Sequence, residues 1–446
     1  MTATFGANQA WGAHTIPNSR VVLQELPFWV VLSLGAYLPA TLSPPQNLFG
    51  VPVGLSDLLL LASGFLYGFL WLANFLRSGR QTLPNGFVLA TLALFGYGAL
   101  RTLSGSLEQQ DQSAMLLTLC LAACAPLQAC GLLSGYNPAE TKQFANRLTL
   151  FLAITCAIYT AESVFNLGLR SEEGRALGTD FGIQRVRGPL FGPSTGYFLL
   201  LPALGWSLAS VVSKQRKNLW SLLLPGSLLA ALLGLGSRAA LILVAALVLL
   251  LAFRTRQLKK KLLALSLFVV SLSFSAFVIY GQADTQRLQS FEDSYRRSTH
   301  ETVWTILSSQ GALESALGAG YGTIWNWYLR DVYKGDRIAV GDNLVSTPFG
   351  ISLYHSHSTV LELLAEFGLP GLVWLLSLAF LLRQLANSST DFAWRVFAFS
   401  LLVSVGSFAF DLFIFKSPRV NTVWWLYLVC ALQLAKSTPW MSRRPL

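Results

Sequence analysis

The residues best suited to acid–base chemistry fall in one segment that follows a long polar interval. His355 and His357 are two of the four histidines, and Ser358, Glu362 and Glu366 follow with a spacing that aligns them on one helical face. An imidazole whose pKa is near neutrality can take a proton from a hydroxyl group, and neighbouring carboxylates can orient it. The pattern predicts a general base at the start of a short amphipathic helix along the membrane interface.

Two other interpretations of this segment stay open. The helix could be merely interfacial, with solvated charges, or the two histidines could bind a metal ion. The metal site is the weaker alternative, because histidines two residues apart point to opposite sides of a strand and no third ligand has a suitable spacing. We therefore expect no metal ion.

Arginines that could bind an anion occur in two short segments. Arg185 and Arg187 stand in a loop with several glycines and prolines, where all four basic residues are arginine, and Arg238 begins a very apolar run. A guanidinium group stays charged and pairs with two phosphate oxygens at once, so a phosphate is its natural partner. The alternatives are a solvated basic loop for the first two residues, and a side chain that snorkels to the interface for Arg238.

The long polar interval adds Arg296, Arg297 and His300, which could contact the same substrate. It also contains a glycine cluster from Gly318 to Gly322, which predicts a turn or a close packing contact. The cluster lacks the Lys-Ser/Thr pair of a P-loop, so we do not expect a nucleotide to bind there.

The composition indicates where these residues must be held. Of the 446 residues, 53% are hydrophobic and only 12% are charged, and the mean hydropathy is +0.52. Soluble domains carry roughly twice this charge density. The composition excludes a soluble enzyme, a disordered chain and a secreted disulfide scaffold, and it predicts an all-α polytopic membrane protein. The five cysteines lie in apolar stretches without a metal-binding spacing and are expected to be small core residues.

A helix that crosses the hydrocarbon core needs about 20 apolar residues. This criterion predicts twelve spans, near residues 22–42, 55–76, 86–104, 114–134, 146–168, 191–213, 219–236, 238–254, 262–281, 369–385, 392–415 and 421–436. Three parts follow from these spans. Residues 1–281 hold nine helices with arginine-bearing outer loops, residues 282–368 form a long outer loop with short helices and the histidine segment, and residues 369–446 hold the last three helices and a tail.

The basic residues predict the orientation of the spans. Placing both termini in the cytoplasm puts most of the 32 Lys and Arg residues on the inner side, as the positive-inside rule requires. The net charge of +11 then reflects topology and contact with anionic lipid, so nucleic acid is not expected as a partner. No cleavable signal peptide is apparent, and the first span should act as an uncleaved anchor. With this topology the arginine segments and the histidine segment all lie on the outer side of the membrane. This predicts an active site at the membrane–water boundary on that side.

At these residues the chain resembles the bacterial O-antigen ligase/polymerase family of polytopic glycosyltransferases. His357-Ser358, then nine residues, then Gly368-Leu369-Pro370-Gly371 fit the family's histidine motif. Ser237-Arg238-Ala239 is similar to its Ser-Arg-Gly/Ala turn. Arg185-x-x-Gly188 before Gly192-Pro193-Ser194 resembles its Arg-x-x-Gly…Asn-Pro-Asn stretch, with Ser194 in place of the second Asn. His300 stands where the family often has an arginine, with Arg296 and Arg297 nearby.

The resemblance implies transfer of a glycan from undecaprenyl diphosphate to an acceptor hydroxyl at the periplasmic face of the bacterial inner membrane. Arg185, Arg187 and Arg238 would bind the diphosphate, and His357 would deprotonate the acceptor, with inversion at the anomeric carbon. His355, outside the matched motif, and Ser358 would contact the substrate, and Glu362 or Glu366 would orient the imidazole. The enzyme would be GT-C-like and would need no metal or other cofactor.

The acceptor remains open between several members of the family. The histidine motif favours an O-antigen ligase, whose acceptor is lipid A-core. A polymerase, which extends the glycan itself, and a transferase to a protein hydroxyl are the alternatives within the family. A transporter of lipid-linked glycans is the alternative from another class. It predicts charges along a path through the bilayer, whereas the basic cluster is expected at the outer face.

Overall fold

The computed structural model describes most of the membrane-type helices and parts of the connections between them. The described residues are 19–38, 46–48, 51–78, 83–104, 109–165, 186–192, 195–213, 223–254, 304, 307–308, 311–322, 338–340, 344–347, 350–353, 358–389, 391–409 and 418–436.

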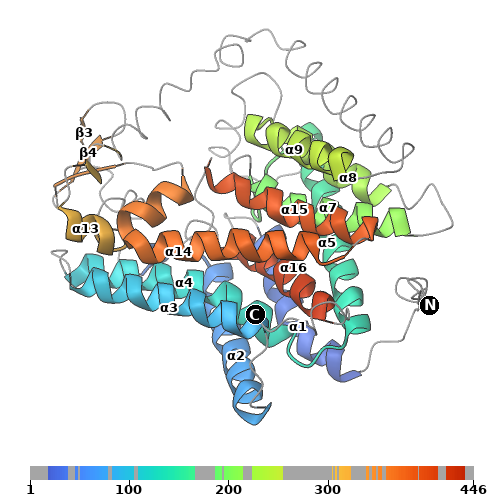
Figure 1. The fold of residues 1–446 in the computed structure, drawn as a ribbon, viewed down its shortest axis with the longest axis horizontal. Coiled ribbons are helices and arrows are strands. Elements are labelled where there is room, and N and C mark those ends of the chain that lie inside the picture. The colour runs from blue at the N-terminus through green and yellow to red at the C-terminus, as the bar shows by residue number, and fades with distance from the viewer. Residues whose placement is uncertain are drawn as a thin grey trace, which may run out of the picture.

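Helices make up the bulk of the described residues (Figure 1). In chain order they are α1 (Ser19–Tyr37), α2 (Leu55–Ser78), α3 (Leu83–Leu103), α4 (Gln109–Leu132), α5 (Pro138–Phe165), α7 (Gly196–Ser213), α8 (Leu223–Gly234), α9 (Arg238–Arg254), α13 (Ala312–Leu317), α14 (Thr359–Asn387), α15 (Phe392–Val405), the 3-10 helix η4 (Gly406–Ala409) and α16 (Pro418–Lys436).

Seven described segments are long and apolar enough to cross a membrane: α2, α3, α4, α5, α7, α14, and α15 together with η4. The helices α8 and α9, predicted as spans near 219–236 and 238–254, are apolar but shorter than these seven segments. The predicted span near 262–281 lies outside the described residues. A multi-helix membrane protein is thus confirmed in outline, whereas the total of twelve spans stays a prediction.

Two small antiparallel sheets supplement the predicted helical fold. In the first, β1 (Gln46–Leu48) pairs with β2 (Val51–Val53), and in the second β4 (Leu344–Thr347) lies between β3 (Ile338–Val340) and β5 (Gly350–Leu353). The sequence around the second sheet alternates short runs rich in Val, Ile and Thr with turn residues, which is typical of hairpins. The all-α prediction did not include these short strands, because long apolar spans dominate the sequence pattern.

The core is centred on α7, which is buried along nearly its whole length. Trp206 of α7 meets Phe397 of α15 edge to face with ring centroids 4.9 Å apart, and Phe198 stacks on Trp424 of α16 at 5.1 Å. Such aromatic pairs add packing contacts to the burial of large side chains. The helix α7 therefore packs against both α15 and α16.

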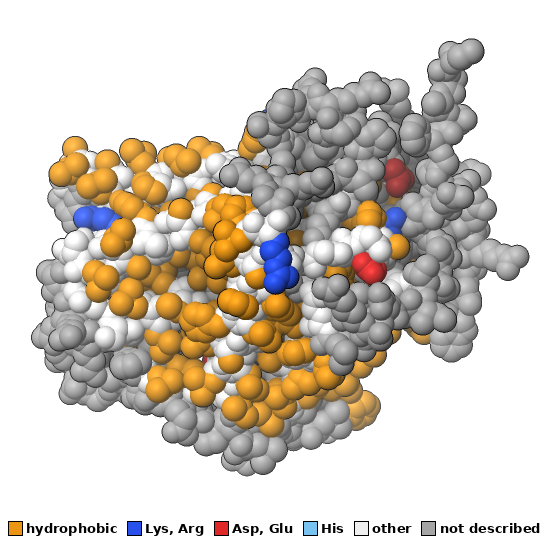
Figure 2. All heavy atoms as spheres, turned by 90° about the horizontal axis from the view of Figure 1, so that it is seen from below, with side chains coloured by type: hydrophobic (Ala, Val, Ile, Leu, Met, Phe, Trp, Pro, Cys, Tyr) orange, Lys and Arg blue, Asp and Glu red, His pale blue; other side chains and the backbone are white. Residues whose placement is uncertain are grey.

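Hydrophobic side chains also cover the outside of the bundle. The helix α2 exposes Phe65, Phe69 and Leu76, and only 28% of its apolar window is buried. Figure 2 shows hydrophobic side chains spread over the described part of one face, with few charged groups among them. A surface of this kind is stable against lipid, where backbone groups are already paired within the helices.

The cysteines follow the expectation of small core residues with one exception. Cys124, Cys130, Cys156 and Cys430 are buried, and all five are free thiols. Cys120 is exposed, so its prediction as a core residue was wrong. Its neighbour Cys124 takes the inward position on α4, where it fills the space left by Gly64 of α2.

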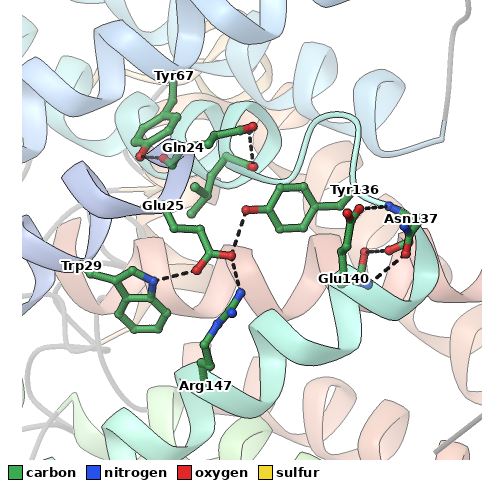
Figure 3. A network of polar contacts seen from close by, with 10 residues as sticks. Gln24, Glu25, Trp29, Tyr67, Tyr136, Asn137, Glu140 and Arg147 are labelled. Atoms are coloured by element: carbon green, nitrogen blue, oxygen red, sulfur yellow. Dashed lines mark hydrogen bonds and ion pairs between the residues drawn. The ribbon is translucent and has the colours of Figure 1, made fainter. Parts of the chain in front are cut away.

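A buried ionic network anchors α1 to the start of α5 (Figure 3). The carboxylate of Glu25 pairs with Arg147 and accepts hydrogen bonds from the indole of Trp29 at 2.8 Å and the hydroxyl of Tyr136 at 2.9 Å. The Glu25 side chain is 4% exposed and that of Arg147 is 33% exposed. Burial, and after it the charge of Glu25, raise the pKa of Tyr136, so this phenol stays a donor. Three donors thus compensate the burial of one carboxylate.

Replacing Glu25 by alanine should lower the free energy of unfolding by about 3 kcal/mol, because three partly buried donors lose their acceptor at once. The matched control is Glu140→Ala, since Glu140 accepts a bond from the amide of Asn137 at an exposed position. That change should cost about 1 kcal/mol or less. Unfolding of both variants in the same detergent measures the difference, and equal destabilisation would contradict the role given to Glu25.

Candidate active site

The histidine segment leads into a kinked helix. Ser358 is the N-cap of α14, where its hydroxyl accepts a bond from the amide of Leu361 at 3.3 Å. Gly368 interrupts the helix with φ 61° and ψ −140°, so α14 consists of a short first part and a long second part. The predicted short helix before a glycine-bracketed turn is confirmed. His355 and His357 lie outside the described residues, directly before the N-cap.

The acidic face of the first part of α14 is buried. Glu362 is 2% exposed and Glu366 is 1% exposed, and Ser358 is buried with them. A helix lying along the interface, with its charges in water, is therefore wrong for this segment. The physical reason is that residues 318–322 and η4 pack against it, as the following contacts show.

The glycine cluster caps the first part of α14. Gly318, Gly320 and Gly322 all have positive φ, a conformation that glycine adopts without strain. The amide of Ala319 donates to the carbonyl of Ala365 at 2.9 Å, and the amide of Gly320 donates to the carbonyl of Glu366 at 3.0 Å. These bonds satisfy carbonyls that the kink removes from the helix. The predicted turn with close packing is thus confirmed.

The same cluster binds a buried carboxylate. The amide of Gly322 donates to Glu366 Oε2 at 2.8 Å, so this oxygen holds the 318–322 segment in place. Glu362 or Glu366 is predicted from the sequence to orient an imidazole, which stays a prediction because both motif histidines lie outside the described residues. The described contact gives one oxygen of Glu366 a partner in the backbone.

Both glycines of the predicted histidine motif lie at close approaches. A Cβ on Gly368 would lie 2.4 Å from the carbonyl oxygen of Ala316 and 2.5 Å from the amide nitrogen of Gly318. A Cβ on Gly371 would lie 2.4 Å from the carbonyl oxygen of Leu363, because the kink folds the two parts of the helix together. The spacing of the motif therefore has a steric cause at this bend.

The C-terminal end of α3 supports the segment from the other side. Arg101 donates from Nη2 to the carbonyl of Gly318 at 2.7 Å, and Tyr97 donates to the carbonyl of Leu317. Thr102 donates to the carbonyl of Tyr321 at 3.0 Å. Sequence reasoning missed these residues, since an arginine in the last turn of an apolar helix looked like an ordinary topology signal.

Tyr321 fills the space between α3, α4 and α14. It is fully buried, and its hydroxyl accepts a bond from Thr118 of α4 at 3.2 Å. Burial, and then the negative charges of Glu362 and Glu366, raise its pKa well above its ordinary value. The phenol therefore stays protonated at any physiological pH. Its role was not predicted, because the pattern Gly-Tyr-Gly indicates a turn but does not indicate which residues the ring contacts.

The arginine loop is residues 186–192 of the described chain, and it docks on the end of α8. The amide of Val186 donates to the carbonyl of Gly234 at 2.8 Å, and a Cβ on Gly234 would lie 2.6 Å from Val186 Cγ2. Gly236, with φ 59°, then turns the chain into α9 at Arg238. The backbone of the Arg187 loop therefore lies beside the chain that leads into the Ser237-Arg238 turn, while the convergence of the arginines on one site stays a prediction. Arg185 and the side chain of Arg238 lie outside the described part.

The 3-10 helix η4 lies between α9 and the N-cap of α14. The hydroxyl of Ser358 donates to the carbonyl of Phe408 at 3.3 Å. On its other side, a Cβ on Gly406 would lie 3.0 Å from Leu243 of α9, and the ring of Phe408 lies 5.6 Å from that of Phe198 on α7. The start of α14 and the first half of α9 therefore contact one common element.

The remaining predicted site residues cannot be located in this arrangement. Arg296, Arg297 and His300 lie outside the described residues, as do the two histidines of the motif. Among the residues that are described, no three His, Cys, Asp or Glu side chains come together in a way that could hold a metal ion.

The apolar helices of the described residues indicate a multi-pass membrane protein. Residues 220–376 match the family model described as O-antigen ligase, so this part of the chain is similar to that family. The match spans the Ser237-Arg238 turn, the glycine cluster and the whole histidine motif, and it confirms the predicted resemblance. No curated protein matches the chain. Members of this family are glycosyltransferase-like enzymes of polysaccharide biosynthesis, with lipid-linked glycans and glycan acceptors as substrates in general.

Proposed function

We propose that the protein transfers a glycan from undecaprenyl diphosphate to lipid A-core, as an O-antigen ligase. The observation that carries the proposal is the family match at residues 220–376, which includes both the arginine turn and the complete histidine motif. The contacts of η4 with Leu243 of α9 and with Ser358 at the start of α14 support a single site. We place this site at the periplasmic face of the inner membrane, with both termini in the cytoplasm.

The donor would enter from the bilayer with its prenyl chain in lipid. Arg185, Arg187 and Arg238 would hold the diphosphate and stabilise the negative charge that develops on it as it leaves. Arginine is suited to this role because its charge persists in an environment that excludes water. Arg296, Arg297 and His300 of the outer loop, with His355, would contact the glycan.

The transfer step balances without a further reactant. His357 takes the proton of the acceptor hydroxyl as its oxygen forms a bond to the anomeric carbon. The bond from that carbon to the diphosphate oxygen breaks, and undecaprenyl diphosphate leaves with the electron pair. Attack opposite to the leaving group inverts the anomeric configuration. The arginines supply the positive charge, so a divalent cation is not required in this scheme.

Reconstitution tests this function. The purified protein in nanodiscs receives a synthetic undecaprenyl-diphosphate oligosaccharide and either lipid A-core or excess donor, with and without EDTA. We expect glycosylated lipid A-core in both conditions. Glycan extended on the donor would show a polymerase instead. Donor that binds without any release of undecaprenyl diphosphate would reject the transferase and favour transport, which flux across liposomes would then measure.

A further inference from the structure

One arginine outside the proposed substrate contacts joins four separate parts of the bundle. Arg419, in the first turn of α16, pairs through Nε with Asp57 Oδ1 at 3.3 Å. Its Nη1 donates to the carbonyl of Gly35 near the end of α1 at 3.2 Å and to the carbonyl of Pro189 in the arginine loop at 3.4 Å. The guanidinium group therefore links the loop to α1, α2 and α16.

A tyrosine makes a second bridge beside the first. The hydroxyl of Tyr159 on α5 donates to the carbonyl of Ala36 at 2.6 Å and accepts a bond from the amide of Leu190 at 2.9 Å. Its ring lies against Gly188, where a Cβ would come within 2.1 Å of Cζ. Arg419 thus links Pro189 of the loop to the carbonyl of Gly35. Tyr159 links the next loop residue, Leu190, to the carbonyl of Ala36.

Asp57 fixes the direction of the guanidinium group. Its Oδ2 accepts a bond from the amide of Gly54 at 3.1 Å, which leaves Oδ1 directed at Arg419. Both side chains are partly buried, with 27% and 19% of their surfaces exposed. An ion pair that also satisfies backbone carbonyls holds its geometry better than an exposed pair.

We propose that Arg419, with Asp57 and Tyr159 as its supports, is a positioning residue that sets the arginine loop for the diphosphate of the donor. This inference rests on the proposed function, because Arg185 and Arg187 are the loop residues assigned to the diphosphate. Arg187 lies two residues from Pro189, and its side chain passes within 3.5 Å of the Cβ position of Gly192. A displacement of about 1 Å at this loop would misplace the guanidinium groups it carries.

The direction in which one substitution changes donor affinity distinguishes a positioning role from direct contact with the donor. In Asp57→Asn, the amide oxygen can keep the bond from Gly54, which turns the NH₂ group towards Arg419. If Arg419 only positions the loop, this change weakens donor binding, as Arg419→Met does. If Arg419 binds the diphosphate itself, losing its negative partner leaves donor binding equal or stronger.

The experiment uses the full-length protein in nanodiscs, with hydrogen exchange of residues 186–192 in the absence of donor and the affinity for the synthetic undecaprenyl-diphosphate oligosaccharide. The variants are Arg419→Met, Asp57→Asn and the control Arg395→Met. Arg395 is a half-buried arginine at the start of α15 that donates to the carbonyl of Ser389 at 3.0 Å, at the end of α15 opposite η4. We expect faster exchange and about tenfold weaker donor binding in the first two variants, and no change of either in the control.

The two readouts also separate failure of this inference from failure of the proposed function. Unchanged exchange in Arg419→Met overturns the positioning role, whatever the protein does. Faster exchange with unchanged donor affinity overturns it as well, since the loop would then not set the donor. Tighter donor binding in Asp57→Asn assigns Arg419 to the donor directly and overturns positioning. A wild-type protein that neither binds nor consumes the donor rejects the proposed function and, with it, the role given to the loop.

Discussion

Alanine at Gly368 should abolish most of the transfer activity and destabilise the fold by about 3 kcal/mol or more. The backbone there has φ 61° and ψ −140°, which residues with a Cβ rarely adopt. The new Cβ would also lie 2.4 Å from a carbonyl oxygen and 2.5 Å from an amide nitrogen of residues 316–318. Neither backbone neighbour can move without losing the cap on the first part of α14, which carries the N-cap next to His357.

Donor turnover and unfolding in detergent check this expectation together. Gly96→Ala is the control, because Gly96 lies in α3 and no described atom is within 4 Å of its Cβ position. That substitution should be neutral or slightly stabilising, as glycine in a helix interior is replaced by the best helix former. A Gly368→Ala protein as active and stable as Gly96→Ala would show that the kink is unimportant.

Substitution of Glu366 should give the second large loss of transfer activity, and the size of the loss should depend on the replacing residue. Glu366→Ala removes the acceptor of the Gly322 amide, and an unsatisfied buried donor costs about 1–3 kcal/mol. The 318–322 segment should then lose its contact with α14 at Gly322, and we expect at least a tenfold loss of transfer. Glu366→Gln keeps a carbonyl oxygen for that amide and should retain most of the activity.

The rates of the two variants, measured with the donor at saturation and below it, test this assignment. Thermal unfolding should follow the same order, with Glu366→Ala less stable than Glu366→Gln. If Glu366→Gln loses as much activity as Glu366→Ala while its fold stays intact, the negative charge itself is needed. The carboxylate would then act on the imidazole, as the sequence suggested, and the backbone contact would be secondary.

Local signals in the sequence were sufficient for the elements that carry the site. The 3.6-residue spacing and the glycines around Pro370 predicted a short helix and a bend, and the structure has both at Thr359 and Gly368. The apolar runs predicted the helices that cross the bundle. The polar segments at Arg187 and Ser237 were expected to converge, and the bond between Val186 and Gly234 brings their backbones together.

Contacts between distant parts of the chain could not be obtained in the same way. Arg101, Tyr321 and Glu366 are far apart in sequence, and each residue type has a common alternative role at a helix end, in a turn or on a solvated face. Burial of the acidic face depends on the 318–322 segment folding over it, which no local pattern specifies. The contacts of Arg419 could not be predicted for the same reason, since its partners belong to three other elements.

The central claim is that the histidine motif supplies the general base of a glycosyl transfer, and one measurement tests it most directly. Single-turnover release of undecaprenyl diphosphate from bound donor is followed in nanodiscs with acceptor present and EDTA added. The variants are wild type, His357→Ala and the control His14→Ala, a histidine expected on the cytoplasmic side. The account predicts unchanged release in the control and at least a 100-fold slower release in His357→Ala with donor affinity retained. Equal release by all three proteins would contradict it.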